Sequence, residues 1–436
     1  MKHVYSLLIF CSGIFVSGYL KGAFTHTIGE YTFAVSGCIN PEISVNTRQV
    51  SSGRTGQEVL YPQPRVYDAE SCDINSVGDT TLSPLNSRMK LHVAGPPAFG
   101  SDQTDMVLST DFRGVSDDVR EVARLCKSYI HFRWHKTHLT CGQDNHPMYL
   151  DDCSPNRVSY AGAAPFEGNT RVPQIKVIKE IHNQEKGCTD ELWLQLYSHG
   201  RGLRDLGPEG PGTQYIRNAH VPAIALQWRK FYKSYVFGLL GGYKRILPRL
   251  ESSIVINAET KKYKDTHALN SGYIGTYVCS KTERAHIQTK ALYLWGGGDT
   301  GMFSGYGVDQ RSAHTGRQTY TNLRTLSLWG DIEWYGHCYD SFAPGLFIGF
   351  SANKGASNDL YTDPTTNEPI VYATEKKLDY LFRLAPRVWW ESGPVKVGCE
   401  VTWDRAAYGT MVTSGKIQDA QSVNNINILV GLFYYF

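Results

Sequence analysis

Beyond its N-terminal region the sequence has no run of about 18 apolar residues, the length that a transmembrane helix needs. It contains no CxxC pair, so neither a zinc ribbon nor a thioredoxin-like site is indicated. A GxSxG nucleophile motif is also missing. The formal net charge of +3 is too small to indicate a nucleic-acid partner. Since no Pro/Ser-rich linker divides the 436 residues, we expect one large unit without helical membrane spans.

Residues 1–23 begin with the basic Lys2, continue with an apolar core over 4–16 and end in small residues. This pattern predicts a signal peptide over 1–23 and a mature chain over 24–436. A membrane anchor is the alternative, but the apolar core is too short to span about 30 Å of hydrocarbon. A lipoprotein signal at Cys11 is disfavoured because bulky residues precede this cysteine.

Removal of the signal would leave an odd number of cysteines. Export permits disulfides, so either one thiol stays free or some cysteines pair between chains. Several could also serve as small apolar residues of a wall. The cysteines are Cys38, Cys72, Cys126, Cys141, Cys153, Cys188, Cys279, Cys338 and Cys399.

Alternation of apolar and polar residues recurs along the mature chain and predicts about sixteen β-strands. Long and short connections alternate between them, as in membrane barrels with long outer loops and short periplasmic turns. Aromatic residues make up 12% of the sequence, which suits the aromatic girdles of such barrels. The predicted strands are 31–45, 89–94, 105–113, 126–135, 138–143, 173–182, 191–198, 223–231, 235–243, 268–280, 285–295, 320–335, 342–351, 378–391, 395–404 and 423–436. The long connections are 46–88, 114–125, 144–172, 199–222, 244–267, 296–319, 352–377 and 405–422.

The last strand, 423–436, is apolar on one face and ends the chain with aromatic residues. A soluble sandwich would seldom end this way, because chain ends usually fray into water. In a transmembrane barrel the same face meets lipid and the terminal aromatics lie at the interface. The residues predicted to face lipid are Ile426, Ile428, Val430, Leu432, Tyr434 and Phe436.

Several stretches together resemble the porin-like outer-membrane proteins of Gram-negative bacteria, kin of the DcaP-type porins. They include INPEISVNTRQV (39–50), SRMKLHVAGPPAFG (87–100), THLTCGQDNHPMY (137–149), FAPGLFIGFSANKGA (342–356) and CEVTWDRAAYGT (399–410). The resemblance covers nearly the whole mature chain and implies a barrel of roughly sixteen strands that is often trimeric. This chain departs from the family in its many cysteines and in lacking an N-terminal coiled coil, which leaves its oligomeric state open.

We therefore expect an all-β fold, a transmembrane antiparallel β-barrel, in the bacterial outer membrane. The expected function is that of a porin, a passive diffusion channel for small hydrophilic solutes, anionic solutes among them, with a structural or adhesive surface barrel as the alternative. We expect no enzyme activity, no cofactor and no metal site. The partners are outer-membrane lipid, the solutes and, through the resemblance, further copies in a homotrimer.

Strand phase predicts which polar residues line the pore. They are His131, Arg133, His135, Gln143, Arg171, Gln174, Lys176, Arg229, Lys290, Asp331, Glu333, Asp379, Arg383, Arg387, Glu391, Lys396 and Glu400. Arg383 and Arg387 lie near mid-strand and are expected to give the lumen a mild anion preference. The alternative is that each is paired with a carboxylate across strands and only holds the wall. The aperiodic connection 144–172 is expected to fold into the lumen and narrow it.

Overall fold

The computed structural model describes residues 23–53, 56, 58–114, 119, 121–183, 187–198, 206–335 and 341–436. Residues 1–22 of the expected signal peptide lie outside this part of the chain, so that expectation stays a prediction. Within the described residues, no helix is long and apolar enough to cross a membrane.

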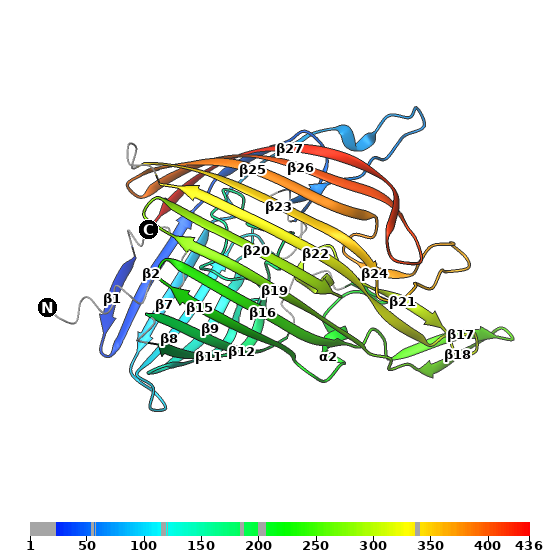
Figure 1. Cartoon of the computed structure of the whole chain (residues 1–436), viewed down its shortest axis with the longest axis horizontal. Helices are drawn as coiled ribbons and strands as arrows, with labels where there is room; N and C mark the ends of the chain where they lie inside the picture. Colours follow the sequence, from blue (N-terminus) through cyan, green and yellow to red (C-terminus); the bar gives the residue numbers. More distant parts are fainter. Residues whose placement is uncertain are drawn as a thin grey trace.

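Sixteen antiparallel wall strands form one closed barrel, which confirms the predicted fold and strand number (Figure 1). The first wall strand is β2 (Tyr31–Ile39) continued by β3 (Glu42–Asn46), and the second is β6 (Asp79–Ser83) continued by β7 (Arg88–Gly95). The others are β8 (Gln103–Asp111), β9 (Arg124–Trp134), β10 (Thr137–Asn145), β11 (Arg171–Asn183), β12 (Cys188–Tyr197), β15 (Ala223–Tyr232), β16 (Tyr235–Ile246), β19 (Leu269–Lys281), β20 (Ala285–Trp295), β22 (Gln318–Trp334), β23 (Phe342–Ala356), β25 (Leu378–Ser392), β26 (Val395–Met411) and β27 (Ile417–Tyr435).

The barrel closes where the last strand pairs with the first. In this seam β27 is antiparallel to β2 and to β3, with Asn427 opposite Asn46. The final residue takes part, because the backbone N–H of Gly37 donates to the carbonyl oxygen of Phe436 at 2.8 Å. A Cβ at Gly37 would lie 2.4 Å from Cζ of Phe436, so only glycine leaves room for that ring.

The two ends of the barrel differ in their connections. The C-terminus, β1 and the short turns lie at one end, and the long connections lie at the other (Figure 1). One predicted long connection, 405–422, is wrong: β26 and β27 pair out to Met411 and Ile417, and only a short turn joins them. The pairing register shifts between Tyr408 and Thr410, and the two strands continue beyond this irregularity to the turn.

Smaller elements lie in the connections and at the N-terminus. They are β1 (Phe24–Ile28), β4 (Val50–Gly53), β5 (Glu58–Pro62), η2 (Ile74–Ser76), β13 (Leu206–Gly207), β14 (Gly210–Pro211), α2 (Gln214–Arg217), β17 (Glu251–Ile256), β18 (Glu259–Lys264), η3 (Gly298–Thr300), β21 (Gly305–Arg311) and β24 (Val371–Ala373). The hairpin β4–β5 is buried inside the barrel, whereas the hairpin β17–β18 is exposed.

The two faces of the wall have opposite character. On β27 the residues Ile426, Ile428 and Val430 point outward and are between 38% and 47% exposed. The alternate residues Asn425 and Asn427 point inward and are nearly completely buried. This inversion, with apolar side chains outside and polar ones inside, is the arrangement of a barrel that stands in lipid.

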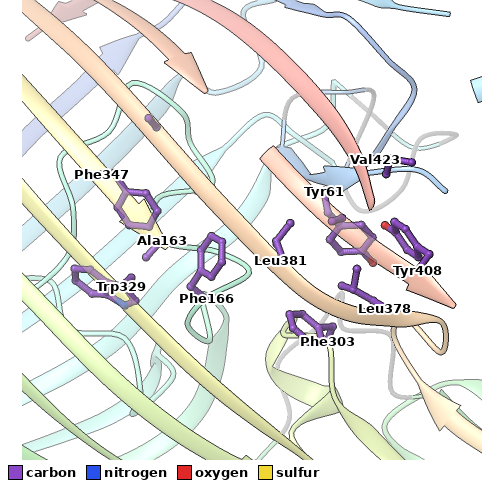
Figure 2. Packing of buried hydrophobic residues seen from close by; sticks show 12 residues of the cluster. Tyr61, Ala163, Phe166, Phe303, Trp329, Phe347, Leu378, Leu381, Tyr408 and Val423 are labelled. Carbon is purple, nitrogen blue, oxygen red and sulfur yellow. The ribbon is translucent and has the colours of Figure 1, made fainter. Parts of the chain in front are cut away.

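The apolar core lies inside the barrel and includes side chains from connections. In the largest cluster, Phe166 from the connection 146–170 and Tyr61 from β5 pack on wall residues such as Phe347 and Leu381 (Figure 2). Small barrels are filled by wall side chains alone. A sixteen-stranded barrel is wider, and here inserted segments fill part of its interior.

Candidate channel lumen

The connection between β10 and β11, residues 146–170 (the lumen loop), runs through the interior of the barrel. Near its start, Met148 and Cys153 pack against Tyr277 and Leu292 of β19 and β20. Further along, Phe166 packs against wall residues of β22, β23 and β25, among them Phe347 (Figure 2). The lumen loop therefore contacts a continuous part of the wall from β19 to β25, which agrees with the prediction that it folds inward.

Ion pairs fix the lumen loop to the wall. Arg157 donates to Glu400 of β26 at 2.6 Å, and both side chains are essentially buried. Asp152 pairs with Arg229 of β15, and Glu167 pairs with Lys290 of β20. A buried charge is costly unless a partner compensates it, so these pairs specify where the loop lies.

Glu167 is the most enclosed of these loop carboxylates. Burial raises its pKa, and the adjacent Lys290 ammonium opposes that rise. The same ammonium also donates to the carbonyl oxygen of Met148 at 3.0 Å. One wall lysine thus holds two points of the lumen loop that are far apart in sequence.

Tyr160 joins the lumen loop to the wall on the opposite side. Its hydroxyl donates to Asp111 of β8 at 3.0 Å. The guanidinium carbon of Arg113 lies 3.9 Å from the centroid of the Tyr160 ring, a cation–π contact. Arg171, at the start of β11, donates to the same hydroxyl at 3.3 Å.

The hairpin β4–β5 is a second inserted segment. The hydroxyl of Tyr408 on β26 donates to the carbonyl oxygen of Pro62 at 2.6 Å. Arg383 of β25 donates to the carbonyl oxygen of Leu60 at 2.9 Å. The hairpin and the lumen loop meet at this arginine, which also donates to Ala164 of the loop at 3.0 Å.

Arg383 and Arg387 are both buried and paired. The Nε of Arg383 lies 2.6 Å from Asp404 on the neighbouring strand. Arg387 makes two hydrogen bonds to Asp331, at 2.7 and 3.0 Å, and a third to Glu333 at 3.3 Å. This geometry matches the alternative in which each arginine is paired across strands and holds the wall.

Most of the predicted pore-lining residues share the inner face of the wall, by burial or by alternation along their strands. They are His131, Arg133, Gln174, Lys176, Arg229, Lys290, Asp331, Glu333, Arg383, Arg387, Glu391, Lys396 and Glu400. Arg171 faces the lumen loop through Tyr160. Asp379 occupies an irregularity in the pairing of β25 with β26 and is partly exposed. Their predicted role as pore-lining residues remains a proposal.

Two of the predicted pore-lining positions are wrong. His135 lies in the turn between β9 and β10 and is exposed, so it is not on a strand. Gln143 lies on β10 in phase with Leu139, whereas Thr140 and Asp144 are the buried inner residues. A one-residue change of phase moves a side chain to the other face of a sheet.

Sequence reasoning missed several inner residues that the fold brings together. Asp105, His138 and Glu180 lie on neighbouring strands and contact the predicted His131 directly or through one another. Their inward orientation could have been predicted, because these residues alternate with apolar ones on β8, β10 and β11. Their proximity depends on strand register, which the sequence does not state.

The cysteines form no disulfide among the described residues, where eight of them are free thiols. Cys338 lies outside the described residues. In the same part of the chain, no group of three or more His, Cys, Asp or Glu side chains is arranged to hold a metal ion.

Comparisons with known proteins identify the fold. No family model matches the sequence, and no curated protein matches it. Among solved structures, the outer membrane channel DcaP of Acinetobacter baumannii matches with a TM-score of 0.64 and 11% identity, over 95% of this chain and 100% of that one. This is the porin fold. OmpT of Vibrio cholerae, in its outer-membrane expressed form, matches with a TM-score of 0.52 and 10% identity, over 95% of this chain and all of that one.

A third porin-fold structure, described as an anion-selective porin from Comamonas acidovorans, matches with a TM-score of 0.51 and 8% identity. It covers 93% of this chain, and the whole of that chain is aligned. At these identities the likeness is one of architecture. The lumen contacts described above are therefore properties of this chain and are not inferred from the similar structures.

Proposed function

We propose that this protein is an outer-membrane channel for small hydrophilic solutes. The observation that carries the proposal is a closed sixteen-stranded barrel that is apolar outside and polar inside. Closure leaves no strand edge in the bilayer, so every wall strand finds its hydrogen-bonding partners within the protein. A polar inner face offers water and solutes a path that lipid does not. We propose no enzymatic role and no cofactor.

The lumen loop is the proposed constriction. Its ends join β10 and β11, and between them its side chains reach β15, β20 and β26 through Asp152, Glu167 and Arg157. A segment held at several points around the wall narrows the cross-section of the barrel. The solute is therefore expected to be small, and selected first by size.

Anion preference remains a prediction. Arg383 and Arg387 are neutralised by Asp404 and by Asp331 with Glu333, so their field in the lumen is weakened. A preference for anions would have to come from other inner charges. Reversal potentials in a salt gradient would measure it.

For assembly, we propose a homotrimer in outer-membrane lipid. The support is indirect: OmpT of Vibrio cholerae has also been solved in a trimer form. The exposed apolar residues of the outer wall suit contact with lipid or with a second barrel equally well. Chemical cross-linking in the native membrane would give the number of copies.

The test is the conductance of the refolded protein in a planar bilayer. We expect stepwise ion currents from single barrels. The control is protein heated to lose its barrel fold, which should give none. A silent bilayer from a protein that shows heat-modifiable gel migration, and is therefore folded, would contradict the proposal.

One observation favours a second candidate, a structural or adhesive surface barrel that conducts nothing. Two segments, the lumen loop and the hairpin β4–β5, are buried in the interior, and several of their side chains are fully enclosed. An occluded barrel would act through its exposed long connections. The bilayer measurement separates the two candidates.

A further inference from the structure

A row of histidines and carboxylates crosses the inner wall from β7 to β11, close to the short-turn end of the barrel (the histidine row). On β7 and β8, Nε2 of His92 lies 3.2 Å from Asp105. Nδ1 of His131 on β9 lies 3.5 Å from the other oxygen of Asp105. The strands are adjacent in the barrel, so the contacts run around the circumference.

The row continues across β10 and β11. Nε2 of His131 lies 3.2 Å from Nδ1 of His138, and the two rings stack. Nε2 of His138 lies 2.9 Å from Glu180, whose second oxygen is 3.2 Å from His182. Four imidazoles and two carboxylates therefore form an unbroken chain of contacts over five neighbouring strands.

The contacts of the histidine row can accommodate added protons. His138 lies within hydrogen-bond distance of both His131 and Glu180. Which nitrogen donates between the two rings depends on the tautomer of each imidazole. Protonation of either ring adds an N–H donor, and Asp105 and Glu180 lie on the two sides of the pair to accept from it.

Other charged groups surround the histidine row. Arg133 on β9 is in register with His138, and Lys90 on β7 lies two residues from His92. On β11 the next inner cation is Lys176, which is paired with Asp144. On β12, Glu191 stands opposite Glu180 and is 3.6 Å from Arg229. The arginine and lysine side chains among these neighbours stay charged over the range in which imidazole titrates, and the four histidines supply the variable charge of the row.

Water reaches the row. The side chains of His92 and His182, at its two ends, are 35% and 39% exposed, while His131 and His138 in its middle are 18% and 12% exposed. Protons can therefore enter from the lumen, and the charge that they bring is felt there.

We propose that the histidine row sets how strongly the short-turn mouth prefers anions, and that this preference grows as its imidazoles take up protons. The inference rests on the proposed channel function. With all four imidazoles neutral the row carries two negative charges, which the adjacent Arg133 and Lys90 offset. With all four protonated the row itself carries two positive charges. Positive charge along a pore favours the passage of anions.

The experiment measures reversal potentials of single channels in a potassium chloride gradient at about pH 8 and about pH 5, the range in which imidazole titrates. We expect the anion-to-cation permeability ratio of the parent to rise by about threefold or more towards the lower pH. In a His131→Gln, His138→Gln double variant at least half of that rise should disappear. Glutamine can still form hydrogen bonds, so the wall should keep its contacts. The matched control is His220→Gln, His314→Gln, two exposed histidines of the long connections, which should behave like the parent.

Two results would overturn the inference while leaving the channel intact. One is a parent whose ratio does not change with pH, and the other is a double variant with the same change as the parent. If neither the parent nor the variants conduct, the proposed function fails, and the row is then tested in detergent by magnetic resonance of histidine labelled with heavy nitrogen. Between about pH 8 and about pH 5 the parent should gain imidazoles that are protonated on both nitrogens. A parent whose row histidines stay neutral over this range would refute the variable charge.

Discussion

The lumen loop and the hairpin β17–β18 both connect wall strands at the same end of the barrel, yet one is buried and the other is exposed. Most of the hairpin's residues, 251–264, are exposed, and it projects from the barrel rim (Figure 1). Met148, Cys153 and Phe166 of the lumen loop are completely buried. Length does not explain the difference, since both are long connections.

The difference lies in how each segment satisfies its backbone and its charges. The hairpin pairs its own strands from Glu251 with Lys264 to Ile256 with Glu259, so it needs no partner from the barrel. The lumen loop has local turns, such as Tyr149 N–H to the carbonyl oxygen of His146, and one bond between its ends, from His146 N–H to the carbonyl oxygen of Thr170. Other groups, such as the carbonyl oxygens of Met148 and Phe166, find partners on the wall. A connection without strand pairing of its own can be buried where the wall supplies hydrogen-bond partners for its backbone groups.

Shortening both connections tests the difference between the buried lumen loop and the exposed hairpin most directly. Deleting Tyr149–Gly168 should raise single-channel conductance by several-fold, because it removes the side chains that cross the lumen. Deleting Ser252–Tyr263 at the hairpin should leave conductance unchanged. Planar bilayer recordings of the two deletions and the parent measure the effect. Equal conductance in all three would mean that the lumen loop does not limit the current.

A smaller effect is expected from one charge that holds the lumen loop. Lys290→Met leaves Glu167 buried without its cation, which should lower the free energy of unfolding by about 3–5 kcal/mol. Urea titration followed by tryptophan fluorescence measures this. Adding Glu167→Gln to the variant should recover much of the loss, since no uncompensated charge remains. A single variant as stable as the parent would show that the pair does not anchor the loop.

The smallest effect is expected on the hairpin. Lys262 and Glu251 form an ion pair at 2.8 Å, but their side chains are 65% and 58% exposed. Water and salt screen such a pair, so Lys262→Ala should not shift the urea midpoint measurably. A shift as large as that of Lys290→Met would remove the distinction between the buried and the exposed connection.

The sequence was sufficient to predict the wall strands. Strands such as 126–135 and 423–436 show period-two alternation because one face meets an apolar phase and the other a polar interior, and that pressure acts on every residue. About sixteen strands and most of the short turns followed from this pattern, but the short turn between β26 and β27 was missed. The inward course of the lumen loop was also expected, from its length and lack of periodicity.

The partners inside the lumen could not be predicted in the same way. Arg383 contacts Asp404, Leu60 and Ala164, which belong to a neighbouring strand and to two separate inserted segments. No local pattern relates such residues, because their proximity depends on how the connections fold. The wrong position of Gln143 has a simpler cause: the phase of a short strand with few apolar residues was ambiguous.

The seam between β27 and β2–β3 fixes the order of events in biogenesis. The first wall strand has its partner in β27, which is separated from it by the whole of the remaining wall, so the barrel cannot close before β27 is present. Until then both edges of the growing sheet expose unpaired backbone groups, which would favour aggregation if they met other chains. Pairing of β27 with β2 and β3 removes both edges in a single step.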